Sequence, residues 1–139
     1  MSLGGLYYAI SEMAVGDVVC RNLDEIKLTI RAEDCPMRLL LPSTEGEMGF
    51  IAIGTLTKTA WKIRDLCLWQ PIMAGSGIEQ CANDMVAYIE LYAAAIRKMR
   101  EPVPGTNLIS ATFKLGPVLW ATSDFWAVDT SLGIEEFLK

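Results

Sequence analysis

The stretch from residue 61 to residue 101 constrains the fold more than any other part of the chain, because it predicts a strand, a glycine turn and one long helix in succession. Apolar and basic residues alternate from Trp61 to Arg64, as they do on a strand with one buried face. Residues 66–69 are apolar throughout, which indicates a strand end that is covered on both faces. Pro71 lacks a backbone donor and is expected to end the strand. We therefore predict that this strand is central in a partly covered sheet.

One long helix is predicted over residues 77–101. Ser76 and Glu79 have the spacing of a capping box, in which the two side chains satisfy backbone donors at the helix start. Apolar residues then recur at every third or fourth position, and this periodicity predicts one stripe that faces the core. The stripe consists of Ile78, Cys81 or Ala82, Met85, Ile89, Tyr92, Ile96 and Met99. Pro102 is expected to end the helix, which is long enough to cross a small sheet.

The outer face of this helix carries small and polar side chains. Its members are Asn83, Ala87, Glu90, Ala94 and Arg97. Such a face is either a solvated surface or a surface kept small so that another element or subunit can approach it. We retain Ala87, Glu90, Ala94 and Arg97 as candidates for a subunit interface.

The segments on either side predict an α+β domain. In chain order they read as a short amphipathic helix at 6–15, strands at 25–31 and 37–41, and, after the long helix, a hairpin of 108–120 with 126–137. The Gly-Pro pair at 116–117 is expected to break or bulge the first hairpin strand. We expect a mostly antiparallel sheet of four to five strands, with the long helix and the short N-terminal helix packed against it. A chain of 139 residues fits this as a single domain.

Residues 42–59 are predicted as a long loop or arm, because Pro42 is expected to end the preceding strand. Links of this length are uncommon in a compact domain unless they have a function. Apolar side chains at Phe50, Ile51 and Ile53 lie in its middle. The segment is therefore either partly an extra short strand or an arm that becomes ordered against a partner. These three residues are further interface candidates.

Trp120 and Phe125 flank a predicted polar turn at 121–124. Large aromatic side chains are anchors of cores and of interfaces alike. Because a polar turn lies at the surface, at least one of the two is expected there, and both are interface candidates.

Charge and composition disfavour several functions. A net charge of −5 argues against a protein that binds nucleic acid by neutralising phosphates. The chain has no histidine, the commonest general base and metal ligand. Adjacent carboxylates at 24–25, 33–34 and 135–136 point to opposite faces of a strand rather than toward one site. We therefore expect no enzymatic activity, no metal, no cofactor and no sequence-specific nucleic-acid binding.

The four cysteines, Cys20, Cys35, Cys67 and Cys81, are too widely spaced for a zinc or redox motif, and we expect structural thiols in a reducing cytoplasm. Hydrophobic residues make up 52% of the chain, yet no apolar run approaches the roughly 18 residues of a membrane helix. The first twenty residues contain no lysine or arginine, so no signal peptide is expected. The apolar surplus indicates either subunit interfaces or an unusually apolar core.

Several segments, taken in order, carry a resemblance to a known family. They are the short N-terminal helix, the Arg-Leu-Leu-Leu-Pro strand at 38–42, a glycine-rich loop, the Trp-Lys-Ile strand at 61–63, the helix from Ser76 to Arg100, and a terminal hairpin that ends in Phe-Trp-Ala-Val-Asp-Thr-Ser-Leu at 125–132. Over roughly residues 6 to 138, this order of elements resembles the tail-terminator and minor tail proteins of long-tailed bacteriophages.

The resemblance implies a non-enzymatic subunit of virion assembly. Such proteins form a homo-oligomer, typically a hexameric ring, that caps the tail tube and joins it to the head. The implied partners are copies of the chain, tail-tube protein and head-completion proteins, in the virion or the host cytoplasm. In that setting residues 42–59 are a contact arm, and the small-residue helix face is a subunit contact.

Two other functions stay open on the residues alone. One is a small dimeric α+β ligand-binding module with an apolar pocket lined by aromatic side chains. The other is a hydrolase that uses a thiol or a carboxylate.

Overall fold

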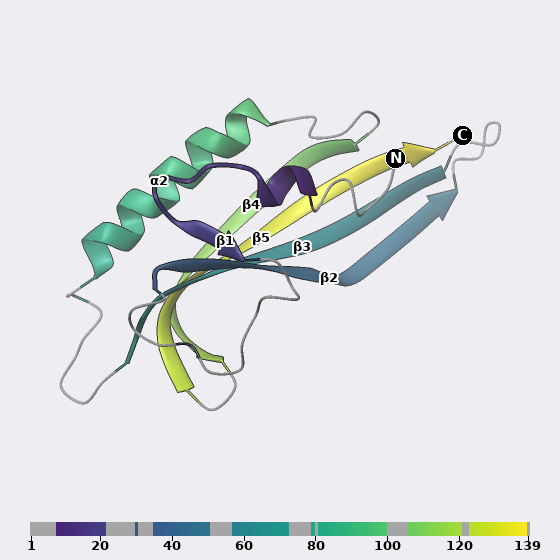
Figure 1. Cartoon of the computed structure of the whole chain (residues 1–139). Helices are drawn as coiled ribbons and strands as arrows, with labels where there is room; N and C mark the ends of the chain where they lie inside the picture. The colour runs from purple at the N-terminus through teal and green to yellow at the C-terminus, as the bar shows by residue number, and fades with distance from the viewer. Residues whose placement is uncertain are drawn as a thin grey trace.

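The computed structural model describes residues 8–21, 30, 35–72, 79, 81–99, 106–120 and 123–138. Five strands in this part of the chain form one sheet in the order β1-β2-β3-β5-β4 (Figure 1). Their bounds are Val19–Arg21 for β1, Met37–Phe50 for β2, Thr57–Pro71 for β3, Thr106–Trp120 for β4 and Ser123–Leu138 for β5. β1 pairs with β2 in parallel, and every other neighbouring pair is antiparallel. Together with the helix α2, Ala82–Lys98, this sheet confirms the predicted α+β fold.

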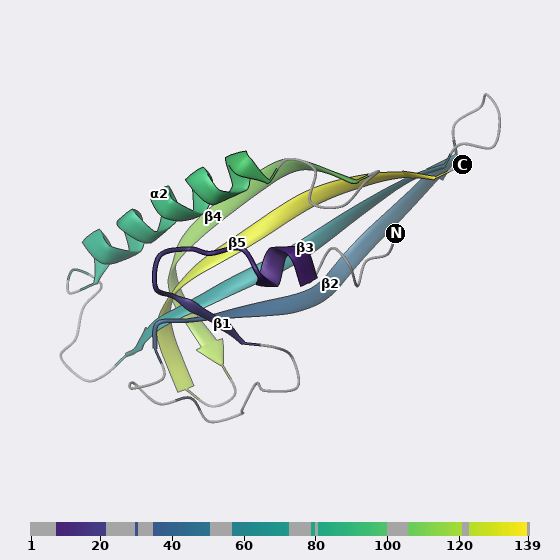
Figure 2. The same cartoon turned by 45° about the horizontal axis from the view of Figure 1, so that its top comes forward.

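α2 and the N-terminal segment, residues 8–18, cover the same face of the sheet (Figure 1, Figure 2). The core beneath them, here called the helix-side core, takes Ile10, Met13 and Val15 from the N-terminal segment, Met85, Tyr88 and Tyr92 from α2, and Leu40, Ile63, Cys67, Val128, Leu132 and Ile134 from the sheet. Side chains alternate along a strand, so Leu66 and Leu68 of β3 point to the opposite face. There they join a second core with Ile30, Met37, Leu39, Phe125 and Ala127. β3 is therefore central, and residues 66–68 near its end are buried on both faces, as predicted, whereas Lys62 near its start is exposed.

α2 is shorter than the predicted helix at 77–101. It begins at Ala82, with Cys81 as N-cap residue and no side-chain cap among the described residues, while the predicted cap Ser76 lies outside the described part. At the other end the Met99 N–H donates to the Ile96 carbonyl at 3.0 Å. The predicted apolar stripe places Met85 and Tyr92 correctly, but it omits Tyr88, which is also buried.

β2 overturns the prediction that Pro42 ends a strand and opens a loop over 42–59. The strand continues to Phe50, and β3 begins at Thr57, so only residues 51–56 lie between the two strands. The register shows why proline is accepted: Leu41 pairs with Arg64, but the next pair is Glu45 with Lys62. Pro42 therefore lies in a bulge, where no ladder hydrogen bond depends on its missing N–H.

β4 and β5 form the predicted hairpin, but the expected break at Gly116 and Pro117 is wrong. These residues pair in register with Ala127 and Trp126 of β5. β4 is the edge strand of the sheet, and an edge strand tolerates proline because its outer side has no ladder to complete. The bulge lies instead between Leu108 and Ser110, in the first half of the strand.

The N-terminal segment differs from the helix predicted at 6–15. Its described helical part is residues 8–11, and a turn from Val15 to Val18 then leads into β1, a strand that the sequence did not indicate. Gly16 in this turn has a φ of 57°, and a Cβ there would lie 3.2 Å from the Leu91 side chain. Both features favour glycine. Of the strand predicted at 25–31, only Ile30 lies in the described part, and it is buried.

Candidate functional site

The outer surface of α2 contains four of the residues that the sequence proposed for a subunit interface. Ala87, Glu90, Ala94 and Arg97 are all exposed on the helix. The helix also exposes two larger apolar side chains that the sequence analysis did not single out: Val86, at 48% of its area, and Leu91, at 51%, on the flank that faces the N-terminal segment. The helix thus presents a mixed apolar, small and charged surface.

The other interface candidates are not placed on this exposed surface. Phe125 is 1% exposed and packs in the second core, so it is a core residue and is not available as a surface contact. Trp120 is half-buried and packs against the same core. Phe50 is the last residue of β2, and its side chain lies outside the described part, as do Ile51 and Ile53 altogether.

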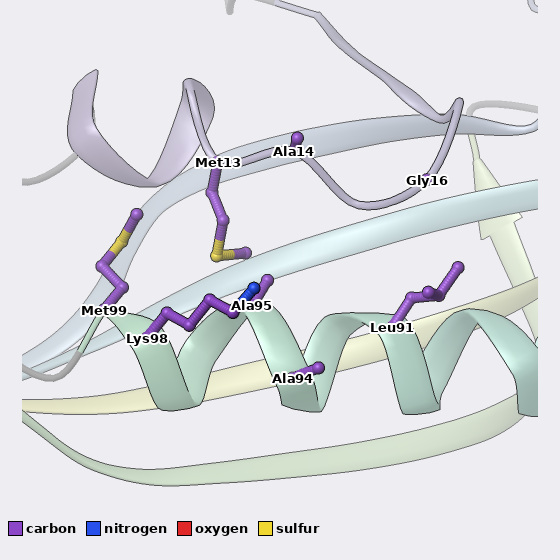
Figure 3. A pocket seen from close by; sticks show the side chains of 8 residues that line it. All are labelled: Met13, Ala14, Gly16, Leu91, Ala94, Ala95, Lys98 and Met99. Atoms are coloured by element: carbon purple, nitrogen blue, oxygen red, sulfur yellow. The ribbon is translucent and has the colours of Figure 1, made fainter.

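A groove of about 620 Å³ runs between the N-terminal segment and the C-terminal half of α2. Figure 3 shows its two walls. The N-terminal segment contributes Met13, Ala14 and Gly16, and α2 with its C-cap residue contributes Leu91, Ala94, Ala95, Lys98 and Met99. Its lining is aliphatic and thioether, with one cation. None of the residues that line it is aromatic. In the helix-side core Tyr88 is in edge contact with Trp69, and Tyr92 with Phe113, each with 5.7 Å between the ring centroids.

A buried polar cluster holds the N-terminal wall of this groove in place. The Arg38 side chain, from β2, donates to the Met13 carbonyl at 2.8 Å and to the Ile10 carbonyl at 3.2 Å. Its Nη2 also donates to Oδ2 of Asp65, on the neighbouring strand β3, at 2.6 Å. Tyr92 of α2 donates its hydroxyl to the same carboxylate oxygen at 2.7 Å. One ion pair therefore connects the N-terminal segment, two strands and the helix.

The pKa shifts of Arg38 and Tyr92 keep both of these groups protonated. Burial alone lowers the pKa of Arg38, but the charge and hydrogen bonds of Asp65 more than compensate, and the guanidinium pKa is raised. Burial, followed by the negative charge of Asp65, raises the pKa of Tyr92 well above its ordinary value. Tyr92 thus keeps the proton that it donates. Arg38 and Asp65 are 1% and 0% exposed, which makes the pair part of the core.

Sequence reasoning missed this cluster, although a signal was present. Asp65 is a charge between the apolar positions Ile63 and Cys67 of one strand face, and Arg38 precedes three leucines. A charge at a buried position needs a partner of opposite sign. The sequence thus indicated that each residue required a partner, but not which one.

The buried thiol of Cys67 lies on the same face of β3, two residues after Asp65. Burial raises its pKa well above the ordinary value, and the negative charge of Asp65 adds to the shift. All four cysteines, each within the described residues, are thiols rather than disulfides. In the same part of the chain, no group of three or more histidine, cysteine, aspartate or glutamate residues is placed to hold a metal ion.

The raised thiol pKa predicts a loss of stability in alkali. A cysteine in the unfolded chain ionises at about pH 8.5, whereas the buried thiol stays protonated at that pH. The unfolded state therefore loses its proton first, and the free energy of unfolding falls as pH rises. Replacing Cys67→Ala is expected to reduce that slope by up to about 1.4 kcal/mol per pH unit between about pH 9 and 10. Urea unfolding at a series of pH values measures it. Equal slopes for the two proteins in that window would contradict the assignment, and equal slopes below pH 8 are the control.

The opposite face of the sheet is open beyond the second core. A shallow hollow of about 330 Å³ there is lined by Lys62, Ile63, Arg64, Thr112, Lys114, Asp129 and Ser131. Arg64 and Asp129 form a two-pronged ion pair, with both N–H···O distances at 2.8 Å. This pair is partly exposed, at 40% and 25%, in contrast to the buried pair on the helix side. The sequence placed Lys62 and Arg64 on one strand face, but not their neighbours from β4 and β5.

Comparison of the sequence with models of known protein families gives no match, and a search among curated proteins gives none either. Within the described residues, no helix combines the length and apolar character needed to cross a membrane. The candidate sites of this protein are therefore two exposed surfaces, the outer side of α2 and the open sheet face, together with the groove.

Proposed function

We propose that this chain is a non-enzymatic assembly subunit that works by binding copies of itself, and that its specific form is a tail-terminator ring of a long-tailed bacteriophage. The observation that carries the proposal is the outer surface of α2. A helix that meets only water places charged and long polar side chains outward. α2 instead exposes Val86 to about half of its area, with small Ala87 and Ala94 on the outward side, and it exposes Leu91 to a similar extent on the flank that faces the N-terminal segment. Apolar area of this kind, rimmed by charge, is typical of protein contacts.

The shape of the sheet supports an additional contact. The long strands β2, β3 and β5 extend past the end of α2 (Figure 2). Strand ends that project beyond a domain can reach a neighbouring subunit in a ring. The predicted contact arm at 42–59 is, on this proposal, the projecting end of β2 and β3. The further partners are tail-tube and head-completion proteins, and the place of action is the virion or the host cytoplasm.

The experiment is the solution mass of the purified chain, measured by light scattering after size exclusion across a concentration series, with negative-stain images of any large species. We expect a ring of several copies, with six as the specific expectation from the resemblance. A mass equal to one chain at every concentration contradicts self-association, and a dimer without a ring contradicts the tail-terminator form.

A pair of variants connects that result to α2. Val86→Ser removes exposed apolar area from the outer helix surface and is expected to weaken assembly. Leu119→Ser removes a comparable side chain, 65% exposed near the end of β4, and serves as the matched control. Both are exposed, so both are expected to change the free energy of unfolding by no more than about 0.5 kcal/mol. If the two variants assemble equally well, the outer surface of α2 is not part of the subunit contact.

The groove favours a second candidate, the dimeric ligand-binding module. Its volume of about 620 Å³ lies within the usual range of ligand pockets, and Lys98 places one cation in an otherwise apolar lining. Native mass spectrometry of the purified protein separates the two functions. A bound small molecule on a dimer supports the module, whereas a ring whose subunits have the mass of the bare chain supports the assembly protein.

A further inference from the structure

One side of the molecule is open in both of its layers. In the sheet layer, β4 is the last strand in the order, and no other strand in the described part of the chain pairs with its outer side. In the helix layer, the N-terminal segment faces one flank of α2 across the groove and continues into β1, at the opposite edge of the sheet. The other flank of α2 therefore lies on the side of β4 (Figure 1, Figure 2).

Pro117 indicates which backbone groups of β4 point outward. Proline has no N–H, and an edge strand accepts it where its nitrogen faces away from the neighbouring strand. From residue 110 to residue 120, β4 pairs with β5 without a bulge, so backbone groups alternate in direction along this stretch. Ala111, Phe113 and Leu115 therefore direct their N–H and C=O groups outward, as Pro117 does its nitrogen. Such groups on a long edge strand are a template for another strand.

The flank of α2 on this side is complementary in charge to a second copy of itself. Val86, Glu90, Ala93 and Arg97 follow one another three or four residues apart, so they lie in one line along the helix. Glu90 and Arg97 are exposed, and neither forms an ion pair within the described residues. An antiparallel copy of the helix, centred just after Ala93, would set each Glu90 against the Arg97 of the other copy.

A ring contact aligns the middle of this flank with the middle of β4. The Tyr92 ring meets the Phe113 ring edge-on, with 5.7 Å between the ring centroids. Ala93 follows Tyr92 in the helix, so the centre of the helix flank lies at the level of the residues beside Phe113. A single two-fold axis can therefore relate both the helix and the edge strand to those of a second copy.

The axis that suits β4 best passes through Thr112. It pairs Thr112 with its own copy, which is a favourable cross-strand pair. It also pairs Ala111 with Phe113 of the other copy, through the backbone groups that point outward. Lys114 then stands opposite Ser110. An axis through Lys114 would instead set two cations directly opposite each other, which is destabilising.

We propose that two copies of this chain associate across this axis, with β4 paired antiparallel to β4 and α2 packed antiparallel on α2. The contact rests on the self-association in the proposed function and names the surface that makes it. It joins the two sheets into one and covers the free edge together with the exposed area of Val86. An isologous contact alone ends at a dimer. A ring would then consist of such dimers, joined through a second contact such as the projecting strand ends.

Charge reversal at Glu90 and Arg97 tests the helix half of the contact. Glu90→Arg sets arginine against arginine, and Arg97→Glu sets glutamate against glutamate. Each is expected to raise the dissociation constant of the dimer by at least about tenfold in sedimentation experiments. The double variant restores opposite charges within every dimer and is expected to associate like wild type. Glu12→Arg, exposed on the N-terminal segment, changes the net charge as Glu90→Arg does and is the matched control.

A cysteine on the axis tests the strand half. Thr112→Cys places two thiols opposite each other, so a mild added oxidant is expected to join two chains, which non-reducing electrophoresis detects. Lys114→Cys stands opposite Ser110 and is expected to cross-link no more than wild type, which already carries thiols at Cys20, Cys35, Cys67 and Cys81. Cross-linking of Lys114→Cys in place of Thr112→Cys would overturn the pairing.

The combined outcomes separate this contact from the proposed function. Dissociation of both single variants, recovery in the double variant and a cross-link at residue 112 support the contact. A double variant that stays dissociated overturns it. A wild-type ring that both single variants form equally well overturns the contact and leaves the proposed function standing. A dimer without a ring that passes both tests supports the contact and overturns the tail-terminator form. A monomer at every concentration overturns both, and far-ultraviolet circular dichroism establishes that each variant is folded.

Discussion

Asp65→Asn is expected to lower the free energy of unfolding by about 3–5 kcal/mol. The substitution keeps the shape of the side chain but removes its charge. Arg38 is 1% exposed and would then be a buried cation without a counter-ion, and this is what makes the loss large. Urea denaturation monitored by tryptophan fluorescence measures the change, with a constant dependence on urea concentration as the sign that only stability has altered.

The same sheet provides the matched control. Asp129→Asn removes a carboxylate from an equivalent pair with Arg64, but there the two side chains are 25% and 40% exposed. Water solvates the remaining arginine, so the expected cost is below about 1 kcal/mol. If the two substitutions cost the same, the buried pair does not have the role given to it. Replacing both partners, Arg38→Met with Asp65→Leu, is expected to recover much of the loss.

Tyr92→Phe is expected to cost about 1.5–3 kcal/mol, because the hydroxyl that it removes donates a hydrogen bond to the charged carboxylate of Asp65. Tyr88, one turn earlier on the same face of α2, is the comparison. Its hydroxyl is buried and has only the thiol of Cys67, a weak hydrogen-bonding group, as a polar side-chain neighbour. Tyr88→Phe is therefore expected to be neutral or slightly stabilising.

The same denaturation experiment tests this pair. Both substitutions delete one oxygen atom from a buried ring, so the loss of packing is closely matched. Only the hydrogen bond differs. A cost for Tyr88→Phe equal to that of Tyr92→Phe would show that ring packing, rather than the bond to Asp65, controls the stability of this region.

The elements that could be predicted are those whose apolar residues recur at a regular spacing along the sequence. Apolar and polar residues alternate in β3 and in the β4–β5 hairpin, whereas apolar residues recur every three to four positions in α2. The type of secondary structure can therefore be predicted without knowing which elements lie beside it. The predictions at the two prolines were wrong because the effect of a proline on a strand depends on where that strand lies in the sheet. Pro42 is accepted in a bulge and Pro117 on an edge strand, and neither the register nor the strand order can be obtained from the residues beside them.

The candidate surfaces were predictable to a lesser extent. The exposed face of α2 followed from helical periodicity, so Ala87, Glu90, Ala94 and Arg97 were placed correctly on the helix surface. Phe125 was misplaced, since a residue next to a polar turn is covered here by the second core around Leu66 and Leu68. To predict the open sheet face, one would have to know that Lys114 and Asp129 lie beside Arg64. Arg64 and Asp129 are 65 positions apart in the sequence, so local patterns do not reveal that they are neighbours.

The hydrogen bonds of Arg38 also determine the order in which the chain can fold. Ile10 and Met13 leave the ribosome before Arg38, whose side chain holds their carbonyls and which comes 25 to 28 residues later. Its counter-ion Asp65 comes a further 27 residues later. A charged arginine is not stable in the core until that carboxylate is in place beside it. The N-terminal segment is therefore synthesised before these two partners, and we expect it to be fixed in place only after them. Attachment of this segment to the sheet therefore requires that β2 and β3 have already paired.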